Sequence, residues 1–275
     1  MKKTYIINIS TFLYNCGGVV VLHKLCHDLN SIGERALITS PITHPALNAP
    51  FVGDAKFNKE ETVVIYPEIV MGNPLKAKHV VRWALNTPGA LECARGDGFY
   101  IYKQPTDLIF KFSEYFSLRD ESESRGLLTV NFVDTDYFGP GETQREGSAY
   151  FVKKGGLHNK VHPDDAINLS EFDGDWTTMS KMLKKLEYFY CYDNACFWVA
   201  VAALCGCIAV VVPDSDMSAK EWYSKFPQLQ CGVAYGLDEI ENAKKTLPFA
   251  QESFREQQNA QLDTVRNFVK ICETL

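Results

Sequence analysis

Short runs of apolar, often β-branched residues alternate with segments of helical periodicity along most of the chain. These runs are apolar along their whole length, as are the strands of a parallel sheet that is covered on both faces. The alternation therefore predicts an α/β protein with doubly wound, Rossmann-like sheets. In the front half, strands are expected over 4–10, 35–39, 62–66, 79–85, 99–102 and 108–112. An amphipathic helix that ends at Gly33 follows the first of them.

The same alternation restarts in the back half after two polar stretches, 119–126 and 139–148, which enclose a strand expected over 127–132. The second stretch has the stronger linker chemistry, so we predict a domain boundary after residue 146. The predicted parts are a domain over 1–146, a second over 147–249, and a C-terminal helix over 250–275 that braces both across a cleft. In the second domain, the expected strands and helices cover 149–152, 176–186, 187–190, 194–205, 208–212, 218–225 and 238–247.

Charge and targeting features exclude several classes of protein. The chain of 275 residues has a formal net charge of −6, without the basic excess of proteins that bind nucleic-acid backbones. The opening residues 1–10 resemble a strand more than a secretory signal. The apolar run 196–212 is divided by Gly206, which favours a buried helix followed by a strand over a membrane span. We therefore expect neither nucleic-acid binding nor a transmembrane segment, and leave peripheral membrane contact open.

Cysteine usage indicates the compartment. The nine cysteines are odd in number and lie mostly in apolar runs, which favours reduced thiols in the cytoplasm. His23, Cys26 and His27 share one helix face, but a zinc site needs further ligands that the sequence does not supply. Asp-x-Asp triplets occur at 134–136, 173–175 and 214–216. We interpret them as solvated turns; as an alternative, the triplet at 134–136 holds a divalent cation.

A Gly17-Gly18 turn lies where the first strand meets the first helix. Glycines at such a point let a ligand approach the backbone, and the following helix N-terminus favours anions. The alternative is a tight turn that requires a positive φ. The turn is not a G-x-G-x-x-G motif, and no acidic residue closes the second strand as a dinucleotide site requires.

Residues 192–206 read YDNACFWVAVAALCG and precede a β-branched strand. This segment resembles the donor-binding motif of retaining GT-B-fold glycosyltransferases, in which an acidic residue precedes E-A-x-x-x-G by seven others. Asp193 occupies the acidic position, and Ala202 and Gly206 match the alanine and the glycine. Val201 stands in place of the glutamate that receives the ribose hydroxyls in the family. The segment 131–140 is similar to the family's crossover phrase, which would make Asp134 a hinge residue.

The resemblance implies roles for further residues. It makes Asp193 the catalytic acidic residue, places Asn15 and Glu68 on the acceptor side, and assigns donor binding to Lys154, Lys160, Asn194, Gly17 and Gly18. Lysines and a helix N-terminus would stabilise the leaving diphosphate without a metal or other cofactor. Taken singly, the lysines suit a solvated loop, and Asp193 suits an N-cap of the next helix.

The sequence thus predicts a glycosyltransferase that moves a sugar from a nucleotide-sugar donor to a glycan or glycolipid acceptor, in polysaccharide or glycoconjugate assembly. The loss of the glutamate at Val201 motivates a first alternative, a non-catalytic nucleotide-sugar-binding homologue. A second alternative is an NAD(P)-dependent oxidoreductase, which the α/β pattern and the Gly-Gly turn motivate. The base, the sugar and the stereochemistry of transfer stay open.

Overall fold

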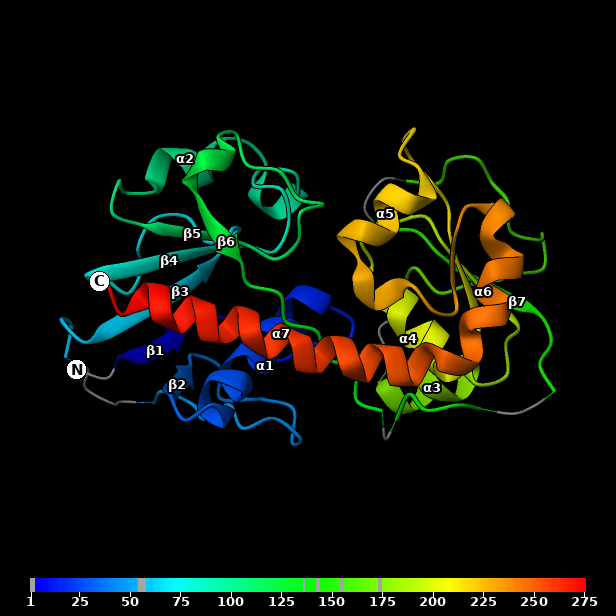
Figure 1. Cartoon of the computed structure of the whole chain (residues 1–275), viewed down its shortest axis with the longest axis horizontal. Coiled ribbons are helices and arrows are strands. Elements are labelled where there is room, and N and C mark those ends of the chain that lie inside the picture. Colours follow the sequence, from blue (N-terminus) through cyan, green and yellow to red (C-terminus); the bar gives the residue numbers. More distant parts are fainter. Residues whose placement is uncertain (1–2, 54–57, 136, 142–143, 154–155, 173–174) are drawn as a thin grey trace. The chain divides into compact units, whose positions relative to one another are not determined.

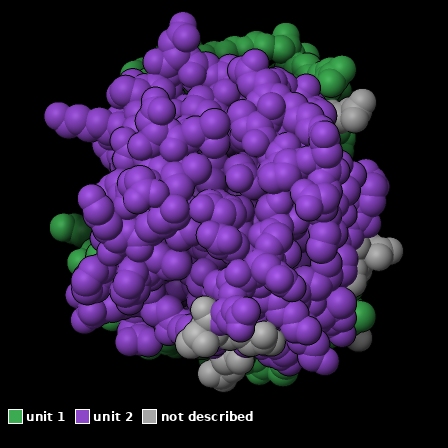
Figure 2. Space-filling model, turned by 90° about the vertical axis from the view of Figure 1, so that its right-hand side faces the viewer, with its two compact units in different colours: residues 1–13, 18–132, 259–275 green, residues 14–17, 133–258 purple. Residues whose placement is uncertain are grey.

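The protein forms two compact units in a computed structural model, which describes residues 3–53, 58–135, 137–141, 144–153, 156–172 and 175–275. Unit 1 comprises 1–13, 18–132 and 259–275, and unit 2 comprises 14–17 and 133–258 (Figure 2). The boundary predicted after residue 146 separates parts of the chain that would fold independently. The two compact units do not test whether each part folds alone. The boundary stays a prediction.

Unit 1 is built on a six-stranded parallel sheet in the order β2-β1-β3-β4-β5-β6 (Figure 1). Its strand order reverses between β1 and β3, the hallmark of a doubly wound sheet. The strands are β1 (Thr4–Ile7), β2 (Arg35–Ile38), β3 (Thr62–Pro67), β4 (His79–Ala84), β5 (Leu108–Lys111) and β6 (Ser124–Leu127). The helices are α1 (Gly17–Ser31) and α2 (Gly98–Tyr102), with 3-10 turns at Glu92–Ala94 and Glu121–Glu123.

Unit 2 repeats this plan with a five-stranded parallel sheet in the order β11-β10-β9-β7-β8, which reverses between β7 and β9. The strands are β7 (Ser148–Phe151), β8 (Ile167–Asn168), β9 (Tyr188–Cys191), β10 (Ile208–Val211) and β11 (Val233–Tyr235). The helices are α3 (Trp176–Leu183), α4 (Phe197–Cys205), α5 (Ala219–Lys225) and α6 (Ile240–Thr246), with 3-10 turns at Pro227–Leu229, Leu237–Glu239 and Leu247–Phe249.

The long helix α7 (Ala250–Cys272) contributes to both units, because its residues up to 258 belong to unit 2 and those from 259 to unit 1. Phe254 is buried in the first part. In the second part Phe268 is buried and packs on Tyr5 of β1 and Phe110 of β5, with ring centroids 5.7 and 5.0 Å apart. The predicted fold class, two Rossmann-like α/β units with a C-terminal helix, is confirmed.

The apolar run 196–212 forms α4 followed by β10, as predicted. Helix α4 is buried on all sides except at Phe197, so it packs as a central helix of unit 2. It ends at Gly206, whose φ of 94° is a left-handed conformation that glycine adopts readily. Arg145 donates hydrogen bonds to the carbonyl oxygens of Cys205 and Leu183. These bonds satisfy backbone acceptors at the C-terminal ends of α4 and α3. None of the described helices has the length and hydrophobicity that crossing a bilayer requires.

Two expected strands are wrong. Residues 99–102 form most of the one-turn helix α2, because four residues are too few to separate a period of 2 from a period of 3.6. The strand expected over 127–132 ends at Leu127. Leu128 N still donates to the carbonyl oxygen of Lys111 in β5, and the bonds to α7 begin at Thr129. There Thr129 N donates to Thr264 Oγ1 at 3.1 Å, and Asn131 N donates to Gln261 Oε1 at 2.9 Å. The short strands β8 and β11 are missing from the prediction.

Candidate functional site

The carboxyl ends of β7 and β9 mark the reversal of strand order in unit 2. Ligands of doubly wound sheets bind outside the carboxyl ends of the strands at this point. The two strands pair in parallel up to Phe151 and Cys191, so the residues that follow them leave the sheet side by side. Asp193 and Asn194, which the sequence assigned to the donor site, come directly after β9.

Asp193 is almost completely buried, with 4% of its surface exposed. The backbone N–H of Lys153, which follows β7, points at Asp193 Oδ1 from 3.4 Å, a long and weak contact. The carboxylate thus lies between the chain segments that leave β7 and β9. The N-cap interpretation of Asp193 is wrong, because α4 begins three residues later than expected and Cys196 occupies the N-cap position.

Asn194 is equally buried and is held from two directions. Its backbone carbonyl accepts a hydrogen bond from Trp222 Nε1 at 3.0 Å, and its side-chain Nδ2 donates to Asp214 Oδ1. Among the described residues its Oδ1 atom has no hydrogen-bond partner, although it is buried. The buried side chain is therefore joined through its Nδ2 atom to Asp214.

Asp214 joins this group from the strand next to β9. It follows β10 and is exposed to solvent, in contrast to Asp193 and Asn194. The sequence placed it only in an Asp-x-Asp triplet. Its position directly behind the apolar strand 208–212 was the available signal, but the contact with Asn194, twenty residues earlier, was not visible.

The segment that follows β7 reaches the same edge through two histidines. His158 Nε2 lies 3.4 Å from the carbonyl oxygen of Val212, next to β10. His162 Nδ1 lies 2.7 Å from Tyr192 Oη, which also accepts a hydrogen bond from the backbone N–H of Val161 at 3.0 Å. Burial lowers the pKa of His162, which favours its neutral form. Segment 156–162 is thereby tied to the ends of β9 and β10.

The two predicted diphosphate-binding lysines have different outcomes. Lys154 lies outside the described residues. Lys160 is exposed and forms an ion pair with Asp164, and this hydrogen bond raises the lysine's pKa. Lys160 thus remains a cation at neutral pH, in solvent and on the segment that follows β7.

The structure gives the Gly17-Gly18 turn a reason other than the one expected. Neither glycine has a positive φ, so the tight-turn interpretation is wrong. A Cβ atom on Gly17 would lie 2.8 Å from Cβ of Phe197, which is closer than real side chains approach. Gly17 therefore permits close packing at the start of α4. A Cβ on Gly18 would meet only Leu85, at an ordinary 3.7 Å. Asn15, in the same turn, is half-buried.

Glu68, predicted on the acceptor side, is buried with 4% of its surface exposed. It follows β3, and its Oε2 accepts a hydrogen bond from the backbone N–H of Leu85, which follows β4, at 2.9 Å. The carboxylate thereby fixes the carboxyl ends of two neighbouring strands in unit 1.

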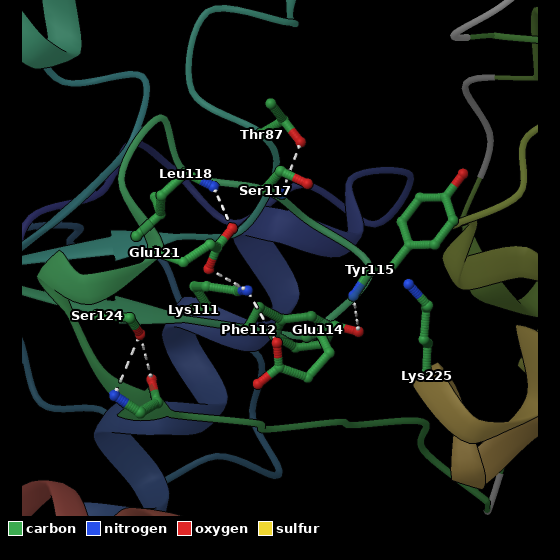
Figure 3. A network of polar contacts seen from close by, with 12 residues as sticks. Thr87, Lys111, Phe112, Glu114, Tyr115, Ser117, Leu118, Glu121, Ser124 and Lys225 are labelled. Carbon is green, nitrogen blue, oxygen red and sulfur yellow. Dashed lines mark hydrogen bonds and ion pairs between the residues drawn. The ribbon is translucent and has the colours of Figure 1, made fainter. Parts of the chain in front are cut away.

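A second polar group of unit 1 lies at the end of β5 (Figure 3). Lys111 Nζ donates to Glu114 and Glu121 at 2.9 and 2.8 Å, and Glu121 also accepts from the backbone N–H of Leu118. Burial acts to lower the pKa of Lys111, but the two carboxylates outweigh it and raise the pKa. Both glutamates are more than half exposed, so this edge presents two carboxylates, and Lys111 balances the charge of one.

The metal alternatives gain no support from the described parts of the chain, in which no three His, Cys, Asp or Glu side chains are grouped to hold an ion. At the zinc candidate, His27 Nδ1 accepts from the backbone N–H of Asn48, and burial raises the pKa of Cys26 to about 12. Asp136 and Asp173, members of two Asp-x-Asp triplets, lie outside the described residues. The triplet at 134–136 therefore stays an untested alternative.

The end of β2 carries no carboxylate for a dinucleotide's ribose. Thr39 and Ser40 follow this strand, and Thr39 Oγ1 donates to the carbonyl oxygen of Ile9 at 2.8 Å. In dinucleotide-binding sheets an acidic residue at this point binds a ribose hydroxyl. The described residues that directly follow β2 therefore lack the acidic group that such a site uses.

No protein-family model matches the chain, and no curated protein does. Solved structures similar to it include a glycosyltransferase of kitacinnamycin, with 9% identity, coverage of 98% of this chain and 95% of the other, and a TM-score of 0.42. An alpha-glucosyltransferase in complex with UDP and a 13-mer DNA has the same identity and coverages and a TM-score of 0.45. Spinosyn rhamnosyltransferase SpnG with thymidine diphosphate has 11% identity, coverage of 96% of each chain, and a TM-score of 0.38.

One of these proteins is in complex with DNA. The expectation that the present chain binds no nucleic acid, which rests on its net charge, stays a prediction.

Proposed function

We propose that the protein is a glycosyltransferase that binds a nucleoside diphosphate sugar at the carboxyl edge of the sheet in unit 2. The observation that carries this proposal is the pair Asp193 and Asn194, two polar side chains buried directly behind β9 at the reversal of strand order. An ionised carboxylate accepts several hydrogen bonds, so Asp193 suits the hydroxyls of a sugar.

In the proposed reaction the bond between the anomeric carbon of the sugar and the β-phosphate oxygen breaks. The nucleoside diphosphate leaves with the bonding electrons, and an acceptor hydroxyl forms the new glycosidic bond and releases its proton. Lys154 and Lys160 are proposed to stabilise the charge that develops on the diphosphate, and Asp193 to bind and orient the sugar. Gly17, Gly18 and Asn194 complete the proposed donor site.

On the acceptor side we propose Asn15 and Glu68. Since Glu68 holds the backbone of Leu85, its proposed role is to position the segment that follows β4. The proposed acceptor is a glycan or glycolipid, and the transferred sugar a hexose or deoxyhexose. All nine cysteines are free thiols, which supports a cytoplasmic location for this step of polysaccharide or glycoconjugate assembly.

A second candidate, a non-catalytic nucleotide-sugar-binding protein, is favoured by Val201. This residue is completely buried in α4 and has no acceptor atom, so it offers no contact of the kind that the glutamate of the resembled motif makes. The two candidates differ in turnover. Release of nucleoside diphosphate from a panel of nucleotide sugars, measured with and without glycan acceptors, supports the transferase, whereas binding without release supports the second candidate.

Nucleotide binding is expected to persist without a divalent cation. If lysines carry the diphosphate, the dissociation constant of UDP or GDP measured by calorimetry should change less than about twofold on addition of EDTA, since no site interaction is removed. Loss of binding in EDTA that Mg²⁺ or Mn²⁺ restores would instead favour a cation held at the 134–136 triplet.

Substitution Lys154→Ala is expected to weaken a nucleoside diphosphate by about 1.5–3 kcal/mol, the range for hydrogen bonds to charged groups. The bare nucleoside should lose almost nothing, because it lacks the phosphates. Lys220→Ala, which removes an exposed lysine from α5, is the control. Equal losses for nucleoside and diphosphate would make Lys154 an ordinary surface lysine.

A further inference from the structure

We propose that Asp214 binds the ribose hydroxyls of the donor nucleotide, and that the protein therefore prefers ribonucleoside over 2′-deoxyribonucleoside diphosphates. This inference rests on the proposed function, since it requires a nucleotide at the carboxyl edge of unit 2. It names a residue that the sequence did not assign to the donor.

The first support is the position of Asp214. Strand β10 pairs in parallel with β9, with Val211 opposite Cys191, and the backbone N–H of Val212 donates to the carbonyl oxygen of Cys191 at 2.8 Å. The chain therefore leaves β10 next to the point where it leaves β9. In doubly wound sheets the ligand lies outside the carboxyl ends of the strands at the reversal point, and β10 is the neighbour of one of the two strands there.

The second support is accessibility. Asp193 and Asn194 are each only 4% exposed, whereas Asp214 is exposed. Of these three side chains, that of Asp214 is the most accessible to a dissolved nucleotide. Val201 cannot supply a contact with the ribose, because it is completely buried and its side chain has no acceptor.

The third support is preorganisation. Asn194 Nδ2 donates to Asp214 Oδ1, and an ionised carboxylate has capacity for further donors at its second oxygen. A vicinal diol presents two O–H donors close together, which one carboxylate can accept. Because Asn194 is buried and already orients the carboxylate, less side-chain freedom is lost on binding. Asn194 is therefore a positioning residue for Asp214.

Asp214 is not a helix cap. A helix cap is the common role of an aspartate in this context, but Ser218 caps α5, because its Oγ accepts a hydrogen bond from the backbone N–H of Glu221 at 3.2 Å. Asp214 lies four residues before that cap and outside the helix.

The test compares ribo and deoxy forms of one nucleotide. Calorimetric titrations of UDP against dUDP, and of GDP against dGDP, are carried out with the full chain and with Asp214→Asn, Asp214→Ala and Asp216→Asn. Asp216→Asn is the matched control, because Asp216 is exposed in the same turn. Melting temperatures verify that each variant is folded, and both positions are on the surface.

We expect the unmodified protein to bind the better ribonucleotide about tenfold more tightly than its deoxy form, the effect of one hydrogen bond to a charged group. Both Asp214 variants should lose this preference, through weaker binding of the ribo form alone, and Asp216→Asn should keep it. A preference retained in the Asp214 variants, or equal affinities in the unmodified protein, overturns the inference and leaves the proposed function standing. Failure of every nucleoside diphosphate to bind overturns the proposed function itself and the inference with it.

Discussion

Substitution Val201→Glu is expected to lower the free energy of unfolding by about 3–5 kcal/mol, the cost of an unpaired charge inside a protein. Val201 lies in the middle of α4 with 0% of its surface exposed, and its neighbours Ala200 and Ala202 are buried as well. A glutamate at this position has no route to solvent from a helix that is packed on all sides. Urea denaturation followed by circular dichroism measures the loss.

The pH dependence separates a buried charge from a simple packing defect. Burial raises the pKa of a glutamate, so the folded state holds the proton more tightly than the unfolded state does. The difference in the free energy of unfolding between the variant and the unmodified protein should therefore be smaller near pH 4 and grow as the pH rises toward 7. Val201→Gln has nearly the same shape without the charge and should show a deficit that does not change over this range.

An opposite outcome would revise the description of this segment. If Val201→Glu melts at the temperature of the unmodified protein and binds nucleotide more tightly, the side chain at position 201 reaches the donor. The ribose would then be bound from α4, and the assignment to Asp214 would fall with it. The buried position of Val201 leads us to expect the loss of stability instead.

Most strands could be predicted because a parallel strand covered on both faces is apolar throughout. All six residues of β3 are buried, and their sequence TVVIYP is recognisable without any partner strand. The same reasoning fails where an element is too short to show a recognisable hydrophobic pattern. Strand β8 has only two residues, both exposed, and β11 has only three, all buried, so neither produces a run that a sequence pattern can detect.

The candidate site was predictable only in part. Asp193 could be nominated because the segment 192–206 resembles a known donor-binding motif, and Asn194 because it lies near the start of the expected helix. Their burial and the contact between Asn194 and Asp214 could not, because these depend on β10 being the neighbour of β9. Gly17 is a similar case, since the reason for a glycine there is the distant residue Phe197.

Substitution Asp107→Ala in unit 1 is expected to destabilise the protein by about 3–5 kcal/mol, because it would leave Arg82 buried without its anion. The side chains of Arg82 and Asp107 are 1% and 3% exposed, and Arg82 Nε donates to Asp107 Oδ2 at 2.9 Å. Two further donors of the guanidinium reach the carbonyl oxygens of Val70 and Gly72, at 3.0 and 2.6 Å. These contacts hold the connection between β3 and β4 against the sheet.

The exposed pair Arg119–Asp97 provides the matched control, because its side chains are 56% and 55% exposed. Asp97→Ala should cost no more than about 1 kcal/mol, since water already solvates both charges. The double variant Arg82→Met with Asp107→Leu should recover much of the loss of Asp107→Ala, because it removes the unpaired charge and fills the space with apolar atoms. Equal losses in the buried single variant and the exposed control would mean that water reaches Arg82. The connection between β3 and β4 would then be held by its carbonyl contacts and not by the ion pair.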